Sequence, residues 1–200
     1  MRPLAAAILS GGESRRMGRP KALLPYRSST FLGHLLEVVR HPRIEFVRVV
    51  LGAHADLIAR EAKLDPAAVV VNEDWENGQL SSIQAAIRSL PRDATEGLLL
   101  CLVDQPLITA ELVAQLIEQF DASGKSVTLP VHRAKRGHPV IFRSTLYEEL
   151  LSAPLELGAR AVVWNHPDEI LAVATEEEGV LLNLNDPETL RRALADVVKP

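Results

Sequence analysis

Cysteine is nearly absent from this 200-residue sequence, and aromatic residues make up only 4% of it. The single cysteine, Cys101, excludes an internal disulfide and is typical of a reducing compartment, so we expect a cytoplasmic protein. Because Cys101 lies inside an apolar run, it is interpreted as an inert core residue rather than a reactive thiol.

Long hydrophobic runs and an excess of positive charge are also missing. The longest apolar stretches, such as 97–103, fall far short of the roughly 20 residues that a membrane-spanning helix needs. Gly11 and Gly12 interrupt the apolar run near the N-terminus, which favours a buried strand over a signal peptide. The 22 basic and 26 acidic residues give a net charge of -4, which does not favour general nucleic-acid binding. We therefore expect neither a membrane nor a nucleic acid as partner.

What is present is the composition of a globular domain, with 47% hydrophobic and 24% charged residues. Continuous apolar runs, typical of strands covered on both faces, alternate with segments of helical periodicity. The predicted strands are 4–9, 46–51, 68–71 and 98–103, and the predicted helices are 30–40, 55–63, 80–90 and 109–120, with Thr109 as an N-cap. This alternation predicts an α/β fold, a three-layer Rossmann-like sandwich with a mostly parallel central sheet, in one domain over residues 1–200.

The pattern is less regular after residue 125. The predicted strands there are 127–130, 140–142, 170–173 and 179–182, and the predicted helices are 144–151, 158–164 and 187–197, the last with proline in its first turn. No repeat, low-complexity tract or linker in the sequence indicates a second domain.

A glycine-rich, basic loop follows the first predicted strand. Ligands of open α/β sheets bind at the carboxyl ends of strands, and Gly11 and Gly12 let the backbone approach a ligand closely. N–H groups in such a loop suit phosphate oxygens, and Arg16 and Lys21 add positive charge. The spacing matches neither G-x-G-x-x-G nor G-x-x-x-x-G-K-[ST], so a solvated surface turn is the alternative from the residues alone.

This loop, LSGGESRRMGRPK at 9–21, resembles the signature L-x-G-G-x-S-x-R-M-G-x-x-K of the molybdopterin-cofactor nucleotidyltransferases. The resemblance extends from about residue 4 to residue 194, with further motifs in the expected order. It implies a fold of the nucleotide-diphospho-sugar transferase type. It also implies nucleotide binding by Leu9, Ser10, Gly11 and Gly12, and neutralisation of phosphate charge during catalysis by Arg16 and Lys21.

Asp104 follows the apolar run 98–103 directly. A carboxylate at the end of a buried strand must be solvated, paired or metal-bound, because burying it bare costs free energy. Mg²⁺ is usually held by one or two carboxylates together with phosphates and water. The resemblance implies that Asp104 is the magnesium-holding, catalytic aspartate of the family. The alternative is an aspartate that caps the turn before Thr109.

A second metal contact is expected in the segment LNLNDPE at 182–188. This segment resembles two family variants, D-x-D-T-P-E and N-x-N-T-P-E, in the asparagine form. Asparagine offers a cation a carbonyl oxygen but no charge. The second contact is therefore assigned to Asn183 or Asn185, with Asp186 as the alternative.

The segment NEDWENGQLSSI at 72–83 resembles the N-x-x-W-x-x-G-x-x-S-S-[IL] element of the cytidylyltransferase branch. The resemblance implies that Asn72, Gly78 and Ser82 border the nucleotide. From the residues alone, Ser81 or Ser82 can equally satisfy free N–H groups at a helix start.

Two later motifs point to the acceptor. Residues 136–142, RGHPVIF, match the R-G-H-P-x-x-F element of the same branch, and 155–160, LELGAR, resembles its G-D-x-G-A-R element. The resemblance implies that His138 lies near the acceptor phosphate and that Arg160 pairs with an anionic group, although a structural role for His138 stays open. Glu156 replaces the family's aspartate, which leaves the identity of the acceptor open.

The implied enzyme is a nucleotidyltransferase with Mg²⁺ as cofactor. An acceptor phosphate oxygen attacks the α-phosphorus of a nucleoside triphosphate and pyrophosphate leaves. Positioning and charge neutralisation can carry this chemistry, so no nucleophilic side chain is predicted. Gly11 and Gly12 are typical of the guanylyltransferase branch, but the two longer motifs favour CTP and a molybdopterin-type acceptor. A molybdoenzyme that receives the cofactor is a partner that the resemblance implies.

Other functions stay open. Within the enzyme class these are GTP as donor, or a sugar phosphate or other phosphorylated acceptor. The asparagine pair Asn183 and Asn185 favours a non-catalytic nucleotide- or cofactor-binding protein. An NAD-dependent oxidoreductase is disfavoured by the missing G-x-G-x-x-G and by Gly52, which stands where an acidic residue is expected.

Overall fold

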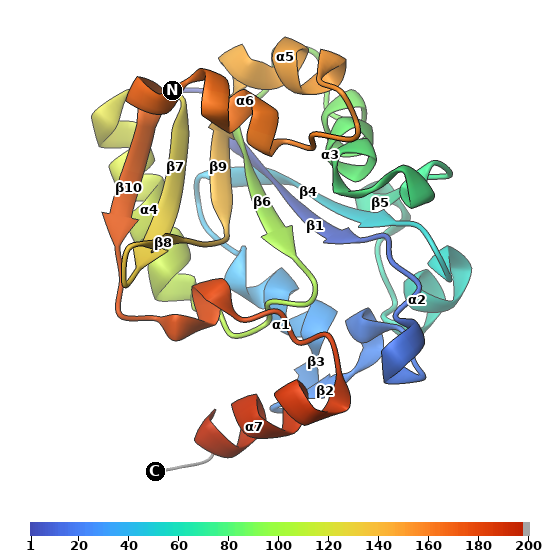
Figure 1. Ribbon diagram of the computed structural model, residues 1–200. Helices are drawn as coiled ribbons and strands as arrows, with labels where there is room; N and C mark the ends of the chain where they lie inside the picture. The colour runs from blue at the N-terminus through green and yellow to red at the C-terminus, as the bar shows by residue number, and fades with distance from the viewer. Residues whose placement is uncertain (198–200) are drawn as a thin grey trace.

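The computed structural model describes residues 1–197, and within them the main sheet has eight strands. Their order is β10-β7-β9-β6-β1-β4-β5, with β8 paired to β7 (Figure 1). The strands are β1 (Leu4–Ser10), β4 (Ile44–Leu51), β5 (Val69–Val71), β6 (Gly97–Leu102), β7 (Val127–His132), β8 (Lys135–Arg136), β9 (Val140–Arg143) and β10 (Ile170–Ala174). β1, β4, β5 and β6 pair in parallel, as do β7 and β10, while β9 runs antiparallel between β6 and β7. The predicted α/β fold with a mostly parallel sheet is confirmed.

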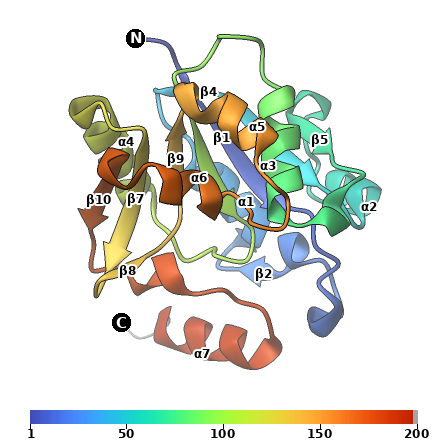
Figure 2. The same cartoon turned by 45° about the horizontal axis from the view of Figure 1, so that its top comes forward.

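Helices cover both faces of this sheet, giving three layers (Figures 1 and 2). They are α1 (Phe31–Val38), α2 (Ala55–Glu61), α3 (Gln79–Arg88), α4 (Ala110–Ser123), α5 (Tyr147–Ser152) and α6 (Arg160–Asn165), while α7 (Pro187–Val197) lies below the sheet in both views. Side chains of β1 alternate between two cores: Ala6 and Ile8 pack with α1 and α4, whereas Ala5 and Ala7 pack with α3, α5 and α6. Because successive side chains of a strand point to opposite faces, a continuous apolar run is what a central strand requires.

Helix starts follow the expected local chemistry. The hydroxyl of Thr109 accepts a hydrogen bond from Leu112 N–H at 3.1 Å, so Thr109 is the N-cap of α4, as predicted. The hydroxyl of Thr30 does the same for α1 through Gly33 N–H. Thr30 also belongs to a short hairpin of β2 (Pro25–Tyr26) and β3 (Ser29–Thr30), which the sequence pattern did not predict.

One predicted strand is wrong. Residues 179–182 belong mostly to a 3₁₀ helix, Glu178–Leu181, and not to a strand. The buried Val180 lies over the backbone of Gly137, and its carbonyl accepts a hydrogen bond from His138 N–H at 3.0 Å. A short apolar run cannot distinguish such a buried turn from a strand.

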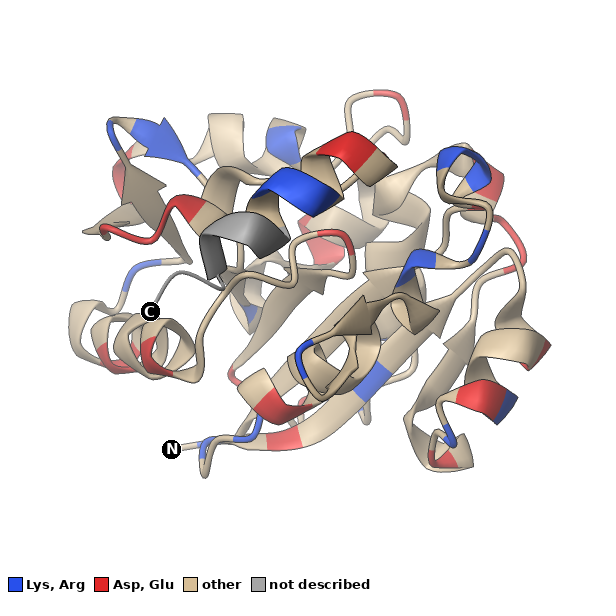
Figure 3. Cartoon of the chain, turned by 90° about the horizontal axis from the view of Figure 1, so that it is seen from below, with Lys and Arg blue, Asp and Glu red and all other residues tan. Residues whose placement is uncertain are grey.

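Four further predictions concern membrane spans, charge, Cys101 and the number of domains. Among the described residues, no helix is long and apolar enough to cross a membrane. Basic and acidic side chains are interspersed over them (Figure 3). Cys101 is fully buried, and burial raises the pKa of its thiol to about 12. The assignment of residues 1–200 to a single domain stays a prediction, and 198–200 lie outside the described residues.

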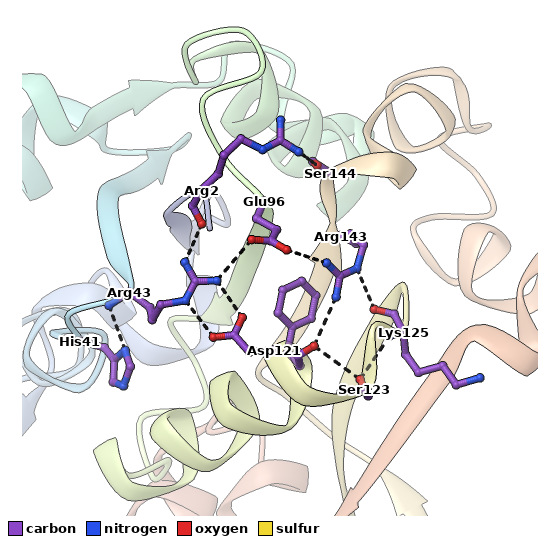
Figure 4. A network of polar contacts seen from close by, with 10 residues as sticks. Arg2, His41, Arg43, Glu96, Asp121, Ser123, Lys125, Arg143 and Ser144 are labelled. Carbon is purple, nitrogen blue, oxygen red and sulfur yellow. Dashed lines mark hydrogen bonds and ion pairs between the residues drawn. The ribbon is translucent and has the colours of Figure 1, made fainter.

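An ion-pair network closes the amino-terminal edge of the sheet (Figure 4). Arg43, just before β4, binds both carboxylate oxygens of Asp121, at 2.8 and 2.7 Å, from the end of α4. Glu96, just before β6, lies 3.5 Å from Arg43 and 3.0 Å from Arg143 of β9. The network therefore ties α4 to three strands, at the amino-terminal ends of β4 and β6 and at the carboxyl end of the antiparallel β9.

Replacing Asp121 with alanine should destabilise the fold by about 2 kcal/mol, because the largely buried guanidinium of Arg43 loses two charge-assisted hydrogen bonds. Urea denaturation measures this change. Arg92→Ala is the matched control, since Arg92 and Asp93 form a long, fully exposed pair at 3.8 Å. Equal effects of the two substitutions would show that the network adds no more than a surface ion pair.

Candidate functional site

Three loops that follow parallel strands, together with the segment before α7, line a cavity of about 520 Å³. They come together because parallel strands end at the same edge of the sheet. Ten predicted site residues line the cavity: Leu9, Ser10, Gly11, Gly12, Lys21, Gly78, Ser82, Asp104, Asn183 and Asn185. Four predicted residues do not line it: Arg16, Asn72, His138 and Arg160.

The ammonium group of Lys21 is one of the groups that line this cavity. Lys21 Nζ is 3.1 Å from Asp104 Oδ2 and also donates a hydrogen bond to Asn185 Oδ1. The backbone N–H of Lys21 donates to the hydroxyl of Ser14 at 3.1 Å, and Ser14 adopts a left-handed conformation with φ 57°. The loop thus folds back on itself, which brings Lys21 next to Asp104, a residue distant in the sequence. Asp104 does not cap the turn before Thr109, because its side chain faces this lysine.

The asparagine pair reaches the cavity through an alternating segment. Leu184 is fully buried and its N–H donates to the carbonyl of Asp104 at 2.7 Å, so Asn183 and Asn185 on either side line the cavity. Sequence reasoning missed Gln105, whose buried amide donates from Nε2 to Asn183 Oδ1 at 2.8 Å. Its position beside Asp104 was the only available signal.

Asp186 and Arg16 lie elsewhere. The carboxylate of Asp186 accepts hydrogen bonds from the N–H groups of Glu188 and Thr189, which caps α7. The hydrogen bonds from Thr189 are the main cause that lowers the pKa of Asp186, and the charge of Arg16 contributes. Arg16 is exposed on the loop after β1, near Asp186 and outside the cavity lining.

The start of α3 forms one side of the cavity. Gly78 precedes this helix with φ 92° and ψ −176°, a conformation that favours glycine. Ser82 lines the cavity, while the buried Asn72 lies behind it and donates from Nδ2 to the hydroxyls of Ser81 and Ser82 at 2.8 and 3.0 Å. Asn72 therefore positions the two serines rather than facing the cavity.

Gly52, at the end of β4, keeps the glycine-rich loop in place. A Cβ at this position would lie 2.5 Å from the carbonyl oxygen of Gly11 and 2.5 Å from Trp75. The same carbonyl accepts a hydrogen bond from Ala53 N–H at 3.0 Å. A side chain at Gly52 would thus displace the loop, which leaves no room for the acidic residue of a Rossmann dinucleotide site.

Gly52→Ala should weaken nucleotide binding about tenfold, because the loop must shift by a substantial part of an ångström to admit the methyl group. Equilibrium dialysis with labelled GTP and CTP measures the affinity. Gly12→Ala is the control for adding a methyl group to this loop. No atom lies within 4 Å of a Cβ at Gly12, so the thermal midpoint of this variant should equal that of the wild type. Unaltered affinity in Gly52→Ala would contradict this role.

A second cavity of about 530 Å³ adjoins the first, and Gly78 and Gln79 line both. His138 and Arg160 lie in this second cavity, together with Arg136 and Glu156. Apolar side chains form much of its wall: Leu80, Ile83, Leu100, Leu129, Val140, Phe142 and Val163. The exposed Trp164 lies at its edge, with the guanidinium of Arg160 5.9 Å from its ring. The arrangement suits a ligand with a flat apolar body and an anionic group.

His138 has an altered protonation equilibrium. Burial lowers the pKa of its imidazole, and the negative charge of Asp104 partly opposes this shift. The imidazole is therefore neutral at pH 7. Below the ordinary His pKa of about 6.5 the unfolded chain binds more protons than the folded chain, so stability falls as the pH decreases through that value.

Wild-type protein should lose unfolding free energy more steeply between about pH 7 and pH 5 than the variant His138→Gln. Urea titrations at several pH values give this slope. His34, whose pKa burial also lowers, is present in both proteins and cancels in the comparison. Parallel curves for the two proteins would show that His138 titrates as it does in the unfolded chain.

The geometry defines a class of protein: an α/β protein with a glycine-rich loop and a lysine–aspartate pair in one cavity at the carboxyl ends of its parallel strands, and a second cavity adjoining it. The sequence profile of the MobA-like NTP transferase domain matches residues 6–170. The chain therefore belongs to the MobA-like NTP transferase family, and it is a nucleotidyltransferase.

Individual relatives differ in name. The chain is 29% identical to nicotine blue oxidoreductase of Paenarthrobacter nicotinovorans, over 96% of each chain. It is 30% identical to a protein of Mycobacterium marinum named "Probable molybdenum cofactor guanylyltransferase", over 98% of this chain and 92% of that protein. The crystal structure of Rv0371c from Mycobacterium tuberculosis superposes with a TM-score of 0.80 at 28% identity, covering 97% of this chain and 98% of that one. Rv0371c is also solved as a complex with manganese, with a TM-score of 0.73 at 26% identity over 96% and 98% of the chains.

Proposed function

We propose that the chain transfers a nucleoside monophosphate from CTP or GTP to a molybdopterin-type phosphorylated acceptor and releases pyrophosphate. The observation that carries this proposal is the pair of adjoining cavities, one lined by the glycine-rich loop, Lys21 and Asp104, and the other by His138 and Arg160. A donor and an acceptor bound in them would meet at Gly78 and Gln79, which border both.

The residues around Lys21 fit a divalent cation. Asp104, Asn183 and Asn185 offer oxygen donors, the kind that Mg²⁺ and Mn²⁺ prefer, and the ammonium of Lys21 already lies on two of these oxygens. No cluster of three Asp, Glu, His or Cys that could hold a metal occurs within residues 1–197, so triphosphate oxygens would complete the coordination. A bound metal would neutralise charge on the triphosphate.

The chain's own residues supply positioning and charge. The N–H groups of the loop at Gly11 and Gly12 hold phosphate oxygens, and Lys21 neutralises the charge that grows on the departing pyrophosphate. Arg16 stays a proposed catalytic residue that reaches the phosphates from the exposed side of the same loop. His138 and Arg160 hold the anionic group of the acceptor so that its oxygen faces the α-phosphorus.

This proposal leaves two donors, CTP and GTP. The motifs at 72–83 and 136–142 favour CTP, whereas the guanylyltransferase name of the mycobacterial relative favours GTP. Gly11 bears on the choice, because a Cβ there would lie 3.2 Å from the hydroxyl of Ser82 and 3.5 Å from Trp75. Gly11 thus keeps the cavity wider at this point, which favours the larger guanine.

A second candidate function comes from the relative named nicotine blue oxidoreductase. The apolar second cavity also suits a flat heteroaromatic compound. The tight contact of Gly52 with Gly11 speaks against the acidic residue that dinucleotide folds use for the ribose, so nucleotidyl transfer is the better-supported function.

The test is pyrophosphate release by purified protein with Mg²⁺ or Mn²⁺ and each of the four nucleoside triphosphates, with and without molybdopterin. Acceptor-dependent release with one of CTP and GTP is the expected result and identifies the base. Oxidation of NADH or NADPH by nicotine blue, with no pyrophosphate from any triphosphate, would replace the proposal with the second candidate.

A further inference from the structure

Lys21 occupies two of the oxygens that the proposed metal ion would use. Its Nζ lies 3.1 Å from Asp104 Oδ2 and donates to Asn185 Oδ1. The side chains of Lys21 and Asp104 are only 16% and 24% exposed, so water screens their attraction less than it would on the surface. The ammonium is therefore held firmly among the candidate ligands.

Lys21 is also the only Lys or Arg among the residues that line this cavity. A triphosphate entering the cavity finds one ammonium group there, and that group is bound to Asp104 and Asn185. An ammonium and a divalent cation repel one another, and a divalent ion bound at Asp104 Oδ2 and Asn185 Oδ1 would compete with Lys21 for these two oxygens. For Lys21 to bind the triphosphate and for the divalent ion to bind Asp104 and Asn185, the lysine must leave these two partners.

We propose that Lys21 exchanges partners on binding: the triphosphate draws its ammonium away from Asp104 and Asn185, and these oxygens then take the divalent ion. The inference rests on the proposed function for the identity of the nucleotide. It makes Lys21 a competitor of free metal as well as a ligand of phosphate. Metal and nucleotide consequently bind together, and free metal alone binds weakly.

The direct test is titration of the nucleotide-free protein with Mn²⁺, with unbound Mn²⁺ measured by electron paramagnetic resonance. Lys21→Met should bind Mn²⁺ about ten- to a hundredfold more tightly than wild type, the range expected for charge-assisted hydrogen bonds that no longer have to be broken. Lys21→Gln provides a second neutral variant should Lys21→Met fold poorly. Asp104→Asn in the Lys21→Met background should lose the gain, which locates the ion at Asp104.

Two controls separate competition from a general charge effect. Arg19→Met removes one positive charge from the same loop, but Arg19 pairs with Glu61 at 2.8 Å and does not contact Asp104. Its effect on Mn²⁺ affinity should be small and should vanish at about 1 M salt, where the Debye length is about 3 Å. The gain in Lys21→Met should persist there, because a direct contact is not screened in this way.

Mn²⁺ affinity unchanged in both Lys21 variants, or a gain that high salt abolishes as in Arg19→Met, would overturn the inference. A gain that survives Asp104→Asn would do the same, since the ion would then lie elsewhere. The titration contains neither nucleotide nor acceptor, so it gives an answer even if no triphosphate yields pyrophosphate. Failure of the inference and failure of the proposed function are therefore separate outcomes.

Discussion

Asp104→Ala should reduce acceptor-dependent pyrophosphate release at least about a thousandfold and leave the thermal midpoint nearly unchanged. Asp104 is the carboxylate that lies against Lys21 at the end of β6, and the other proposed metal contacts, Asn183 and Asn185, carry no charge. Losing it removes the only fixed negative charge of the proposed metal contacts, which neutral amides cannot replace. The measurement is kcat at saturating Mg²⁺ and triphosphate.

The neighbouring carboxylate supplies the control. Asp186→Asn should keep turnover within about threefold, because asparagine can still accept the N–H groups of Glu188 and Thr189 at the start of α7. A large loss in Asp186→Asn together with normal turnover in Asp104→Ala would move the metal contact to Asp186. Normal turnover in both variants would remove this edge of the sheet from the mechanism.

The central part of the fold was predictable because its apolar runs alternate with segments of helical periodicity. The seven residues of β1 are all buried, as expected for a strand covered on both faces, and the structure ends that strand at Ser10, one residue beyond the prediction. The run 179–182 lacked this clarity. Val180, its one buried residue, packs on Gly137 rather than pairing with a strand, and no local pattern carries that information.

In the candidate site, too, some contacts could be predicted from the sequence and others could not. The motif residues Lys21 and Asp104, far apart in sequence, meet because the carboxyl ends of β1 and β6 adjoin in the sheet. The parallel sheet predicted from the sequence placed both residues at one edge, and the structure adds that their two strands are neighbours. Gln105 and Gly52 act through contacts with residues 78 and 41 positions away, Asn183 and Gly11, so their roles depend on the folded chain. Nothing in the residue types alone assigns such contacts.

Lys21→Ala should lower kcat by about a hundred- to a thousandfold, the range seen when one charge-stabilising donor is removed from an active site. The proposed reason is that Lys21 is the one basic side chain lining the nucleotide cavity, so only the exposed Arg16, outside that lining, would be left to neutralise the departing pyrophosphate. KM for the triphosphate should rise less than kcat falls, because the charge on the leaving group grows mainly in the transition state.

The matched control is Arg19→Ala, two residues earlier in the loop. Arg19 pairs with Glu61 of α2, outside the cavity, so kcat should change less than about threefold. If Lys21→Ala raised only KM, Lys21 would hold the ground-state triphosphate without stabilising the transition state. The Mn²⁺ titration separates two roles of Lys21. A Lys21 variant with lower kcat and tighter binding of free metal would show that this lysine both stabilises the phosphates and competes with the metal. Lower kcat with unchanged metal binding would leave Lys21 a ligand of the phosphate alone.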